Sequence, residues 1–307
     1  ASGVIKTIGD PVERFSEDGL RPLRACRFGA QLNFAVDKKT QDAIPKVLNV
    51  VNMVSKERVR DELKKIMSSE RPSVGIEMMR TSGMLELILP ELMQGFGVKQ
   101  NKFHKHDVYY HNLYTCDAAP AGNINVRFAA LLHDLAKPIC KNPDLEDGDT
   151  TFYNHEIVSA GMTKRILRRL KFSNEEIDTI TRLIRLHMFH YTNEWTDGAV
   201  RRFMRKAGLD LLPELFSLRE ADRIGNGLKT GRSNSIERLK RRIEKIIEEQ
   251  NAISLKDLAV DGNDIMDIKK IPPGPEVGKI LNSLLEYILD NPEKNTRECL
   301  IDYARGL

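Results

Sequence analysis

The chain has 307 residues, 41% of them hydrophobic and 30% charged, which excludes a disordered chain or a short secreted module and suits a globular protein of about two domains. Its formal net charge of +4 is too small to predict nucleic-acid binding, so any site for a polyanion must come from local clusters of basic residues. The four cysteines lie far apart, which excludes a disulfide scaffold and a thiolate zinc site. The sequence has no long apolar run and no signal peptide, which excludes a membrane protein and favours a cytoplasmic protein.

Apolar residues recur at intervals of three and four along almost the whole chain, whereas the alternation typical of strands is rare. The sequence therefore predicts an all-α fold. Polar breaks that contain glycine fall near residues 95–105 and 225–235. They divide the chain into three helical regions, which are residues 1–100, 101–225 and 226–307.

Two helix starts are marked by their residue types. Asp10 supplies an N-cap and Glu13 a capping-box acid, so the first helix is predicted to begin at Pro11. The third region opens with a highly charged helix near Ile236. Because its charges fall on neighbouring turns, we expect this helix to present a solvated face.

Acidic and basic residues alternate shortly after the first helix. The run Glu17-Asp18-Gly19-Leu20-Arg21 is followed by Arg24 and Arg27. If this segment is helical, the three-residue spacing places one acid and the three bases on one face. An ordinary surface ladder of salt bridges explains the same spacing. Pro22 has no amide hydrogen, so a helix must begin or kink there.

The middle region carries an adjacent His133-Asp134 pair at the end of an apolar helix, with Pro138 behind it as a helix stop. Around this pair, one or two helical elements apart, lie His111, His155, His187 and Asp222. Five helices could bring these groups to one point, and such donors suit Zn²⁺, Fe²⁺, Mn²⁺, Ni²⁺ or Co²⁺. A metal held there would support phosphoester hydrolysis, with Asp134 and Lys137 as the catalytic side chains and Lys137 binding the phosphate. The alternative is a set of hydrogen-bonded core histidines.

Two helices carry clusters of basic residues suited to phosphate contacts. The first contains Lys164, Arg165, Arg168, Arg169 and Lys171, and the second contains Arg201, Arg202, Arg205 and Lys206. Either cluster could instead be an ordinary solvated face. We expect structural or surface roles for His104, His106 and His190. The acidic loop Asp147-Gly148-Asp149 is expected to be solvated.

Short motifs follow one another in a characteristic order along the chain. They are Ile8-Gly9-Asp10-Pro11, Arg14-Phe15, the EDGLR and RACRF runs at residues 17–21 and 24–28, Leu32-Asn33-Phe34, Glu57-Arg58, Leu89-Pro90-Glu91-Leu92, residues 187–191 and 195–197, Arg219-Glu220-Ala221-Asp222-Arg223, residues 257–264 and Pro273-Gly274-Pro275. This series resembles class II tRNA nucleotidyltransferases, the CCA-adding enzymes and bacterial poly(A) polymerases. The order of histidines and aspartates in the middle region resembles the HD superfamily of metal-dependent phosphohydrolases.

The resemblance implies a neck over residues 1–100, an HD-containing body over 101–225 and a helical, tRNA-binding tail over 226–307. In the neck it gives Asp18 and Arg21 the selection of CTP and ATP, with Arg24 as a supporting or phosphate contact. Cytosine and adenine both place an amino donor beside a ring-nitrogen acceptor, so one carboxylate and one guanidinium can pair with either base. In the body it implies a first metal held by His111, His133, Asp134 and Asp222, and a second metal at His155 and His187.

Family members carry a head domain with a GGxxRD stretch and a DxD pair that hold Mg²⁺ for nucleotide transfer, and this combination does not occur here. We therefore expect the chain to be the carboxy-terminal portion of a tRNA nucleotidyltransferase that adds CCA, or part of it, to tRNA. As it stands the chain is expected to be unable to transfer nucleotides. The alternatives are a poly(A) polymerase, a self-standing HD phosphohydrolase that acts on phosphomonoesters or 2′,3′-cyclic phosphates, and a non-catalytic RNA-binding module.

Overall fold

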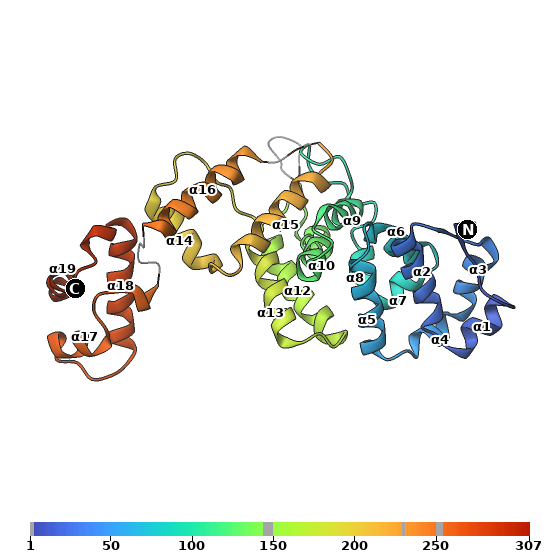
Figure 1. Cartoon of the computed structure of the whole chain (residues 1–307), viewed down its shortest axis with the longest axis horizontal. Coiled ribbons are helices and arrows are strands. Elements are labelled where there is room, and N and C mark those ends of the chain that lie inside the picture. The colour runs from blue at the N-terminus through green and yellow to red at the C-terminus, as the bar shows by residue number, and fades with distance from the viewer. Residues whose placement is uncertain (1–2, 144–149, 229–230, 232, 250–253) are drawn as a thin grey trace. The chain divides into compact units, whose positions relative to one another are not determined.

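The structure, a computed structural model, describes residues 3–143, 150–228, 231, 233–249 and 254–307, so the loop Asp147-Gly148-Asp149 lies outside the described residues. The predicted all-α fold is confirmed, because the described residues are mainly helical and their strands are only two residues long (Figure 1). Strand β1 (Val4–Ile5) pairs in parallel with β2 (Ala35–Val36), and β3 (Asn142–Pro143) pairs antiparallel with β4 (Thr150–Thr151). No helix in these ranges is long and apolar enough to cross a membrane.

The chain divides into two compact units, one of residues 1–189 and 213–231 and one of residues 190–212 and 232–307. The helices of the first unit are α1 (Pro11–Glu17), α2 (Arg21–Leu32), α3 (Lys38–Ala43), η1 (Ile44–Val47), α4 (Leu48–Asn52), α5 (Lys56–Met67), α6 (Pro72–Thr81), α7 (Met84–Ile88), α8 (Pro90–Met93), α9 (Val108–Ala118), α10 (Ile124–Leu132), α11 (Lys137–Cys140), α12 (His155–Arg169), α13 (Asn174–Leu186) and α15 (Leu212–Gly225). Those of the second are α14 (Asp197–Ala207), α16 (Asn234–Glu248), η2 (Leu255–Asp257), α17 (Gly262–Lys269), α18 (Pro275–Asp290), η3 (Pro292–Lys294) and α19 (Arg297–Gly306). The division into three regions stays a prediction.

The first helices begin where the residue types predict. Asp10 Oδ1 accepts hydrogen bonds from the amides of Val12 at 2.9 Å and Glu13 at 3.0 Å, which starts α1 at Pro11. Helix α2 begins at Arg21 with Pro22 in its first turn, where the missing amide hydrogen costs no helical bond. The expected break at Pro22 is thus a helix start.

Helix α10 is the buried centre of the first unit. It packs against α5, α9 and α13, and its apolar residues Phe128 and Leu131 are almost fully buried. Arg127 is buried as well, and its guanidinium donates to the carbonyls of Ala119 at 2.9 Å and Ser69 at 2.6 Å. These bonds satisfy a buried charge with backbone acceptors and tie α10 to the chain after α5 and α9. The end of α10, where His133 and Asp134 lie, is therefore rigidly placed.

Gly225 allows α15 to approach α9 closely. A Cβ atom at this position would lie 2.2 Å from Thr115 Oγ1 and 2.5 Å from the Thr115 amide nitrogen. We expect Gly225→Ala to lower the free energy of unfolding by about 1–3 kcal/mol, because a methyl group must push the helices apart. Urea denaturation measures this change. Gly161→Ala on α12, where a Cβ meets open space, is the matched control and should be neutral or slightly stabilising. Equal effects of the two substitutions would contradict the packing argument.

The second unit has an apolar core of its own. Helices α17, α18 and α19 pack together around Ile265, Leu284, Ile288 and Leu300, all of which are fully buried. Helix α16 turns one apolar side inward and leaves most of its charged residues at least partly exposed. The charged helix near Ile236 is therefore amphipathic, with a solvated face as expected.

Candidate functional site

Five helices of the first unit place six buried side chains next to one another. We call this set the His–Asp cluster, and its members are His111, His133, Asp134, His155, His187 and Asp222. His111 lies on α9, His133 directly follows α10, His155 begins α12, His187 follows α13 and Asp222 lies on α15. Every member is at most 9% exposed, so the cluster is shielded from bulk water.

The Nε2 atoms of the histidines point at the two carboxylates. His111 Nε2 lies 3.3 Å from Asp134 Oδ2 and 3.3 Å from Asp222 Oδ1, and the corresponding distances from His133 Nε2 are 3.2 and 3.7 Å. His155 Nε2 lies 3.1 Å from Asp134 Oδ1, and His187 Nε2 lies 3.9 Å from the same oxygen. Asp134 is thus central to the cluster.

Backbone carbonyls decide which ring nitrogen of three histidines carries the proton. The Nδ1 atoms of His133, His155 and His187 lie 2.6–2.8 Å from the carbonyls of Ala130, Phe152 and Ile184, and must donate to them. In the neutral rings Nε2 is therefore a bare acceptor. His155 Nε2 and Asp134 Oδ1 face each other and neither has a hydrogen-bond partner. Two buried acceptors at this distance are satisfied by a cation between them, so these residues fit a metal ion.

Burial and neighbouring charges shift the pKa values of the cluster. Burial alone would lower the pKa of His133, but Asp134 and Asp222 outweigh it and raise the pKa to about 10. Burial would raise the pKa of Asp134, but His133 and Lys137 hold it well below its usual range. Burial and the charge of His133 lower the pKa of His187 to about 3. The carboxylates are therefore ionised and His187 is neutral, as a metal requires, whereas His133 carries a proton that a bound metal would displace.

Two subsets of the cluster have donor atoms close enough to share one ion. In each subset the donors lie within 4.8 Å of one another: His111, His133 and Asp222 form one, and His133, Asp134 and His187 form the other. Both contain only imidazole nitrogen and carboxylate oxygen, which suit divalent first-row metals.

Lys137 follows Asp134 by three residues, and its ammonium group is held on three sides. Its Nζ atom lies 2.6 Å from Asp134 Oδ2, 2.6 Å from Gln100 Oε1 and 3.4 Å from His104 Nε2. Asn101 Oδ1 accepts the Nδ1 proton of His104 at 2.7 Å, so Nε2 is the acceptor for Lys137. His104 and Gln100 are neighbours of the site that the sequence reasoning missed. The only available signal was the histidine-rich run from His104 to His111.

Asp18 and Arg21 lie at the junction of two helices instead of on one helix face. Asp18 is the C-cap of α1, and Arg21 is the first residue of α2. The expectation that the acid and the three bases share a helix face is therefore wrong for Asp18. Gly19 makes the junction compact, because a Cβ there would lie 2.4 Å from the carbonyl oxygen of Val50.

Each proposed base-reading side chain has protein partners. Asp18 Oδ1 accepts from the Leu20 amide at 3.1 Å, and Arg58 Nη2 lies 3.0 Å from Asp18 Oδ2. These two groups outweigh partial burial and lower the pKa of Asp18. Arg21 donates through Nη1 to Glu17 at 2.5 Å and to the Arg14 carbonyl at 2.7 Å. Its remaining donors have no partner in the described residues, so they are free for a ligand.

The remaining residues of this ladder form local ion pairs. Arg24 Nε lies 3.9 Å from the buried Glu62, which also pairs with Arg27 at 3.2 Å and Lys65 at 3.0 Å. The alternative of a salt-bridge ladder thus describes much of this segment. Arg24 is nonetheless exposed on the same helix as Arg21.

The first basic helix is partly free for a polyanion. Lys164, Arg165 and Arg168 are exposed on α12, and none pairs with an acid in the described part of the chain. Arg169 differs, because it forms an ion pair with Glu91 at 2.6 Å. The first three residues therefore present three positive charges to solvent.

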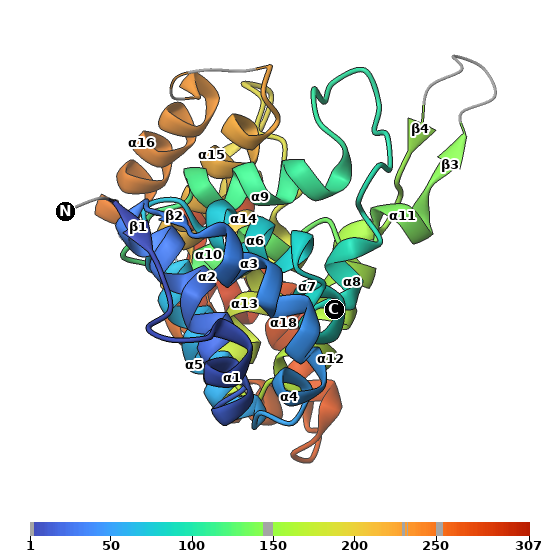
Figure 2. The ribbon, with the colours of Figure 1, turned by 90° about the vertical axis from the view of Figure 1, so that its right-hand side faces the viewer.

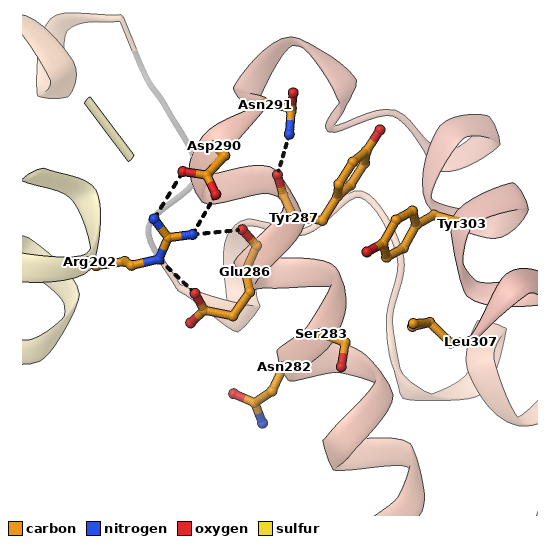
Figure 3. A pocket seen from close by; sticks show the side chains of 9 residues that line it. All are labelled: Arg202, Asn282, Ser283, Glu286, Tyr287, Asp290, Asn291, Tyr303 and Leu307. Carbon is orange, nitrogen blue, oxygen red and sulfur yellow. Dashed lines mark hydrogen bonds and ion pairs between the residues drawn. The ribbon is translucent and has the colours of Figure 1, made fainter. Parts of the chain in front are cut away.

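The arginines of the second basic helix, α14, bond to groups of the second unit, as Figure 3 shows for Arg202. Arg201 is buried and donates to the Leu289 carbonyl at 2.9 Å. Arg202 forms ion pairs with Glu286 at 2.8 Å and Asp290 at 2.6 Å, and Arg205 pairs with the same Glu286 at 2.8 Å. These bonds join α14 to α18. Arg201 is withheld from solvent, and Arg202 and Arg205 already pair with acids, which leaves them less available to RNA; the contact of this helix with RNA stays a prediction.

Comparison with known proteins assigns the chain to a family. A family described as "Probable RNA and SrmB-binding site of polymerase A" matches residues 33–95, and tRNA nucleotidyltransferase domain 2 matches residues 153–304. The A-adding tRNA nucleotidyltransferase of Deinococcus radiodurans is 33% identical over 282 residues, 88% of this chain and 64% of that protein. The chain belongs to the class II tRNA nucleotidyltransferase family. A second member, the CC-adding enzyme of Thermus thermophilus, is 30% identical over 89% of this chain and 63% of its own length.

Solved structures of tRNA nucleotidyltransferases have the same fold. The CCA-adding enzyme of Bacillus stearothermophilus in complex with CTP aligns with a TM-score of 0.68 at 21% identity, over 99% of this chain and 65% of that one. The Thermotoga maritima CCA-adding enzyme complexed with tRNA aligns with a TM-score of 0.52 at 18% identity, over 99% and 64%. The chain thus spans just under two thirds of the length of these tRNA nucleotidyltransferases.

Proposed function

We propose that the chain is the nucleotide-selecting and RNA-binding part of an enzyme that adds CCA, or part of it, to the 3′ end of tRNA from CTP and ATP. Mg²⁺-dependent transfer would need a head domain as partner, since the chain lacks the combination of a GGxxRD stretch and a DxD pair. The observation that carries this proposal is the helix junction at which Asp18 and Arg21 lie in the sequence order of the family. Its test is the Asp18 substitution described in the Discussion.

The free atoms of this junction match the edges of cytosine and adenine. Asp18 uses one lone pair of Oδ1 for the Leu20 amide and contacts Arg58 from one side, which leaves acceptor capacity for an exocyclic amino group. Arg21 has its Nε and Nη2 hydrogens available for the adjacent ring nitrogen. Uracil and guanine present the reverse pattern and would leave both side chains unpaired. Arg24, exposed one turn along α2, would contact the triphosphate.

For RNA binding we propose the exposed cations of α12. Replacing Lys164, Arg165 and Arg168 together by glutamine should weaken binding of all tRNAs alike and make the slope of log K against log salt shallower by about three. Titration of fluorescent tRNA at several salt concentrations measures the slope.

The control for this variant replaces Arg238, Arg241 and Lys245, three exposed cations on the solvated face of α16, by glutamine. It removes the same charge from another surface. An equal change of slope in both triple variants would show that only net charge matters and would contradict a phosphate contact at α12. The product formed by the protein with its head domain would distinguish addition of CCA, CC or A from a poly(A) tail.

We propose metal-dependent phosphoester hydrolysis at the His–Asp cluster as a second function, because its bare nitrogen and oxygen acceptors converge on one point. A bound Mn²⁺, Ni²⁺, Fe²⁺, Co²⁺ or Zn²⁺ would lower the pKa of a water molecule towards about 7 and polarise a phosphoryl oxygen. The first-metal ligands would be His111, His133, Asp134 and Asp222, with His155 and His187 for a second ion. Lys137, whose ammonium group lies 2.6 Å from Asp134 Oδ2, would supply a positive charge for the phosphate.

The experiment loads the metal-free chain with each of these ions and follows hydrolysis of 2′,3′-cyclic AMP. We expect one or more ions to restore activity that a chelator removes. Tight metal binding without hydrolysis of cyclic nucleotides or phosphomonoesters would show that the cluster is a structural metal site. A chain that binds tRNA with a steep salt dependence but hydrolyses nothing would be a non-catalytic RNA-binding module.

A further inference from the structure

Three charged side chains connect α1 to the first residue of α2. Arg14 Nη1 lies 2.9 Å from Glu17 Oε1 and 3.3 Å from Glu17 Oε2, so one guanidinium contacts both oxygens of the carboxylate. Glu17 Oε2 in turn accepts from Arg21 Nη1 at 2.5 Å. Arg21 and, to a smaller extent, Arg14 lower the pKa of Glu17. We call these three residues the Arg–Glu–Arg bridge, in which the charge of Glu17 offsets the repulsion between the two guanidinium groups.

The bridge fixes the plane of the Arg21 guanidinium. Arg21 Nη1 carries two hydrogens, of which one is bound by Glu17 and the other by the Arg14 carbonyl oxygen at 2.7 Å. Because the guanidinium is planar, these two bonds also set the directions of Nε and Nη2, the donors that are left for a base. A contact with the edge of a base depends on such fixed directions.

Arg14 is itself held in place by its surroundings. Its Nε donates to the Ile8 carbonyl at 3.2 Å, and the neighbouring Phe15 is only 2% exposed, which anchors α1 in the first unit. Gly9 has a φ of 83°, a left-handed conformation that favours glycine, and it lets the chain turn between Ile8 and α1. Helix α1 packs against α2 and η1, and Figure 2 shows it next to α2. These contacts give a common structural role to the two motifs that precede the EDGLR run.

Glu17 alone would restrain Arg21 only weakly. The side chains of Glu17 and Arg21 are 46% and 39% exposed, and an exposed ion pair contributes little because ordering two long side chains costs conformational entropy. The contact of Arg14 with both carboxylate oxygens limits the positions that Glu17 can take. Asp18 is held by a separate contact, since it pairs with Arg58. A change at Arg14 therefore acts on the Arg21 side of the junction.

We propose that Arg14 is a positioning residue for nucleotide selection, which holds Glu17 and, through Glu17, directs the free donors of Arg21 towards the base. This inference rests on the base-reading role proposed above for Arg21. The ring nitrogen on the pairing edge of cytosine or adenine accepts a hydrogen bond, whereas the corresponding nitrogen of uracil or guanine carries a hydrogen. A guanidinium of fixed direction therefore favours the first two bases, and one that turns freely discriminates less.

The test measures the choice among the four nucleoside triphosphates when the chain acts with the head domain proposed above. Arg14→Gln removes the ion pair with Glu17 but keeps the carbonyl that accepts from Arg21. We expect the preference for CTP and ATP over UTP and GTP to fall about 3- to 30-fold, which is less than the fall in Arg21→Ala. Arg14→Lys restores the charge but not the planar group, so it should recover only part of the preference.

A double-mutant cycle separates positioning from a general structural role. If Arg14 acts through Arg21, Arg14→Gln should change nucleotide choice little in a chain that already carries Arg21→Ala, whereas independent effects would add. Arg305→Gln on α19 is the matched control, because it breaks an exposed ion pair with Asp302 at the same three-residue spacing, and it should leave nucleotide choice unchanged. Thermal melting verifies the fold of each variant.

The outcomes distinguish this inference from the proposed function. Unchanged nucleotide choice in both Arg21→Ala and Asp18→Ala would overturn the base-reading role and, with it, this inference. A changed choice in Arg21→Ala together with an unchanged choice in Arg14→Gln would overturn the inference alone. Additive effects of Arg14→Gln and Arg21→Ala would also overturn it, because they would show that Arg14 acts by another route.

Discussion

Asp134→Asn is expected to abolish stoichiometric binding of divalent metal by the chain and, with it, any phosphoesterase activity. Asp134 is the carboxylate that both subsets of histidines face, with His111, His133 and His155 nitrogens 3.1–3.3 Å from its oxygens. An amide of the same shape supplies no negative charge, and its NH₂ group would point at bare imidazole nitrogens or at Lys137. Metal content after dialysis and isothermal titration calorimetry measure the loss.

The same substitution should destabilise the metal-free chain. Without Asp134 the charges of His133 and Lys137 stay buried with less compensation, which typically costs about 3–5 kcal/mol when one partner of a buried pair is removed. Asp210→Asn, at an exposed aspartate, is the control and should change neither metal content nor stability. An Asp134→Asn chain that still binds one equivalent of metal at wild-type affinity would rule out the proposed ligand set.

Asp18→Ala is expected to relax nucleotide choice when the chain acts with the head domain proposed above. In the proposed role the carboxylate is the acceptor for the amino group shared by cytosine and adenine, and an alanine would leave that group without a partner. A two-bond contact of this kind discriminates between bases by about 1–3 kcal/mol, so the preference for CTP and ATP over UTP and GTP should fall roughly 10- to 100-fold. Incorporation of each of the four nucleotides into tRNA measures the preference.

Two variants make this result specific to the carboxylate. Glu13→Gln, on the exposed face of α1, should leave nucleotide choice unchanged. Arg58→Ala removes the ion pair that orients Asp18 and should weaken selection less than Asp18→Ala, because the Leu20 amide still holds Oδ1. Unchanged choice in Asp18→Ala would show that base recognition lies elsewhere.

Several features of the fold could be predicted because they depend on neighbours in the sequence. The all-α class follows from apolar spacing, the start of α1 from Asp10 and Pro11, and the start of α2 from the missing amide hydrogen of Pro22. The six members of the His–Asp cluster could be singled out as well, since each lies on or next to a helix and has a metal-binding side chain. Asp18 and Arg21 could be singled out as candidates through the order of motifs.

Other features could not be read from spacing. Arg202 belongs to a basic helix in the sequence, but its charge is neutralised by Glu286 and Asp290, more than eighty residues away. His104 was expected to be a structural or surface residue, and only the fold shows that the loop before α9 places it against Lys137. Asp18 and Arg21 suggested one helix face, yet a helix ends at one and begins at the other.

By itself, then, the sequence determined the helical class, the helix starts and the list of residues that can bind a metal or a base, because propensity, capping and donor chemistry are local. The tertiary structure decided which histidine nitrogen faces the carboxylates, which cations remain free for RNA and which loop borders the cluster. These depend on the packing of segments far apart in the chain, where a charge or a lone pair is either satisfied by a partner or left available.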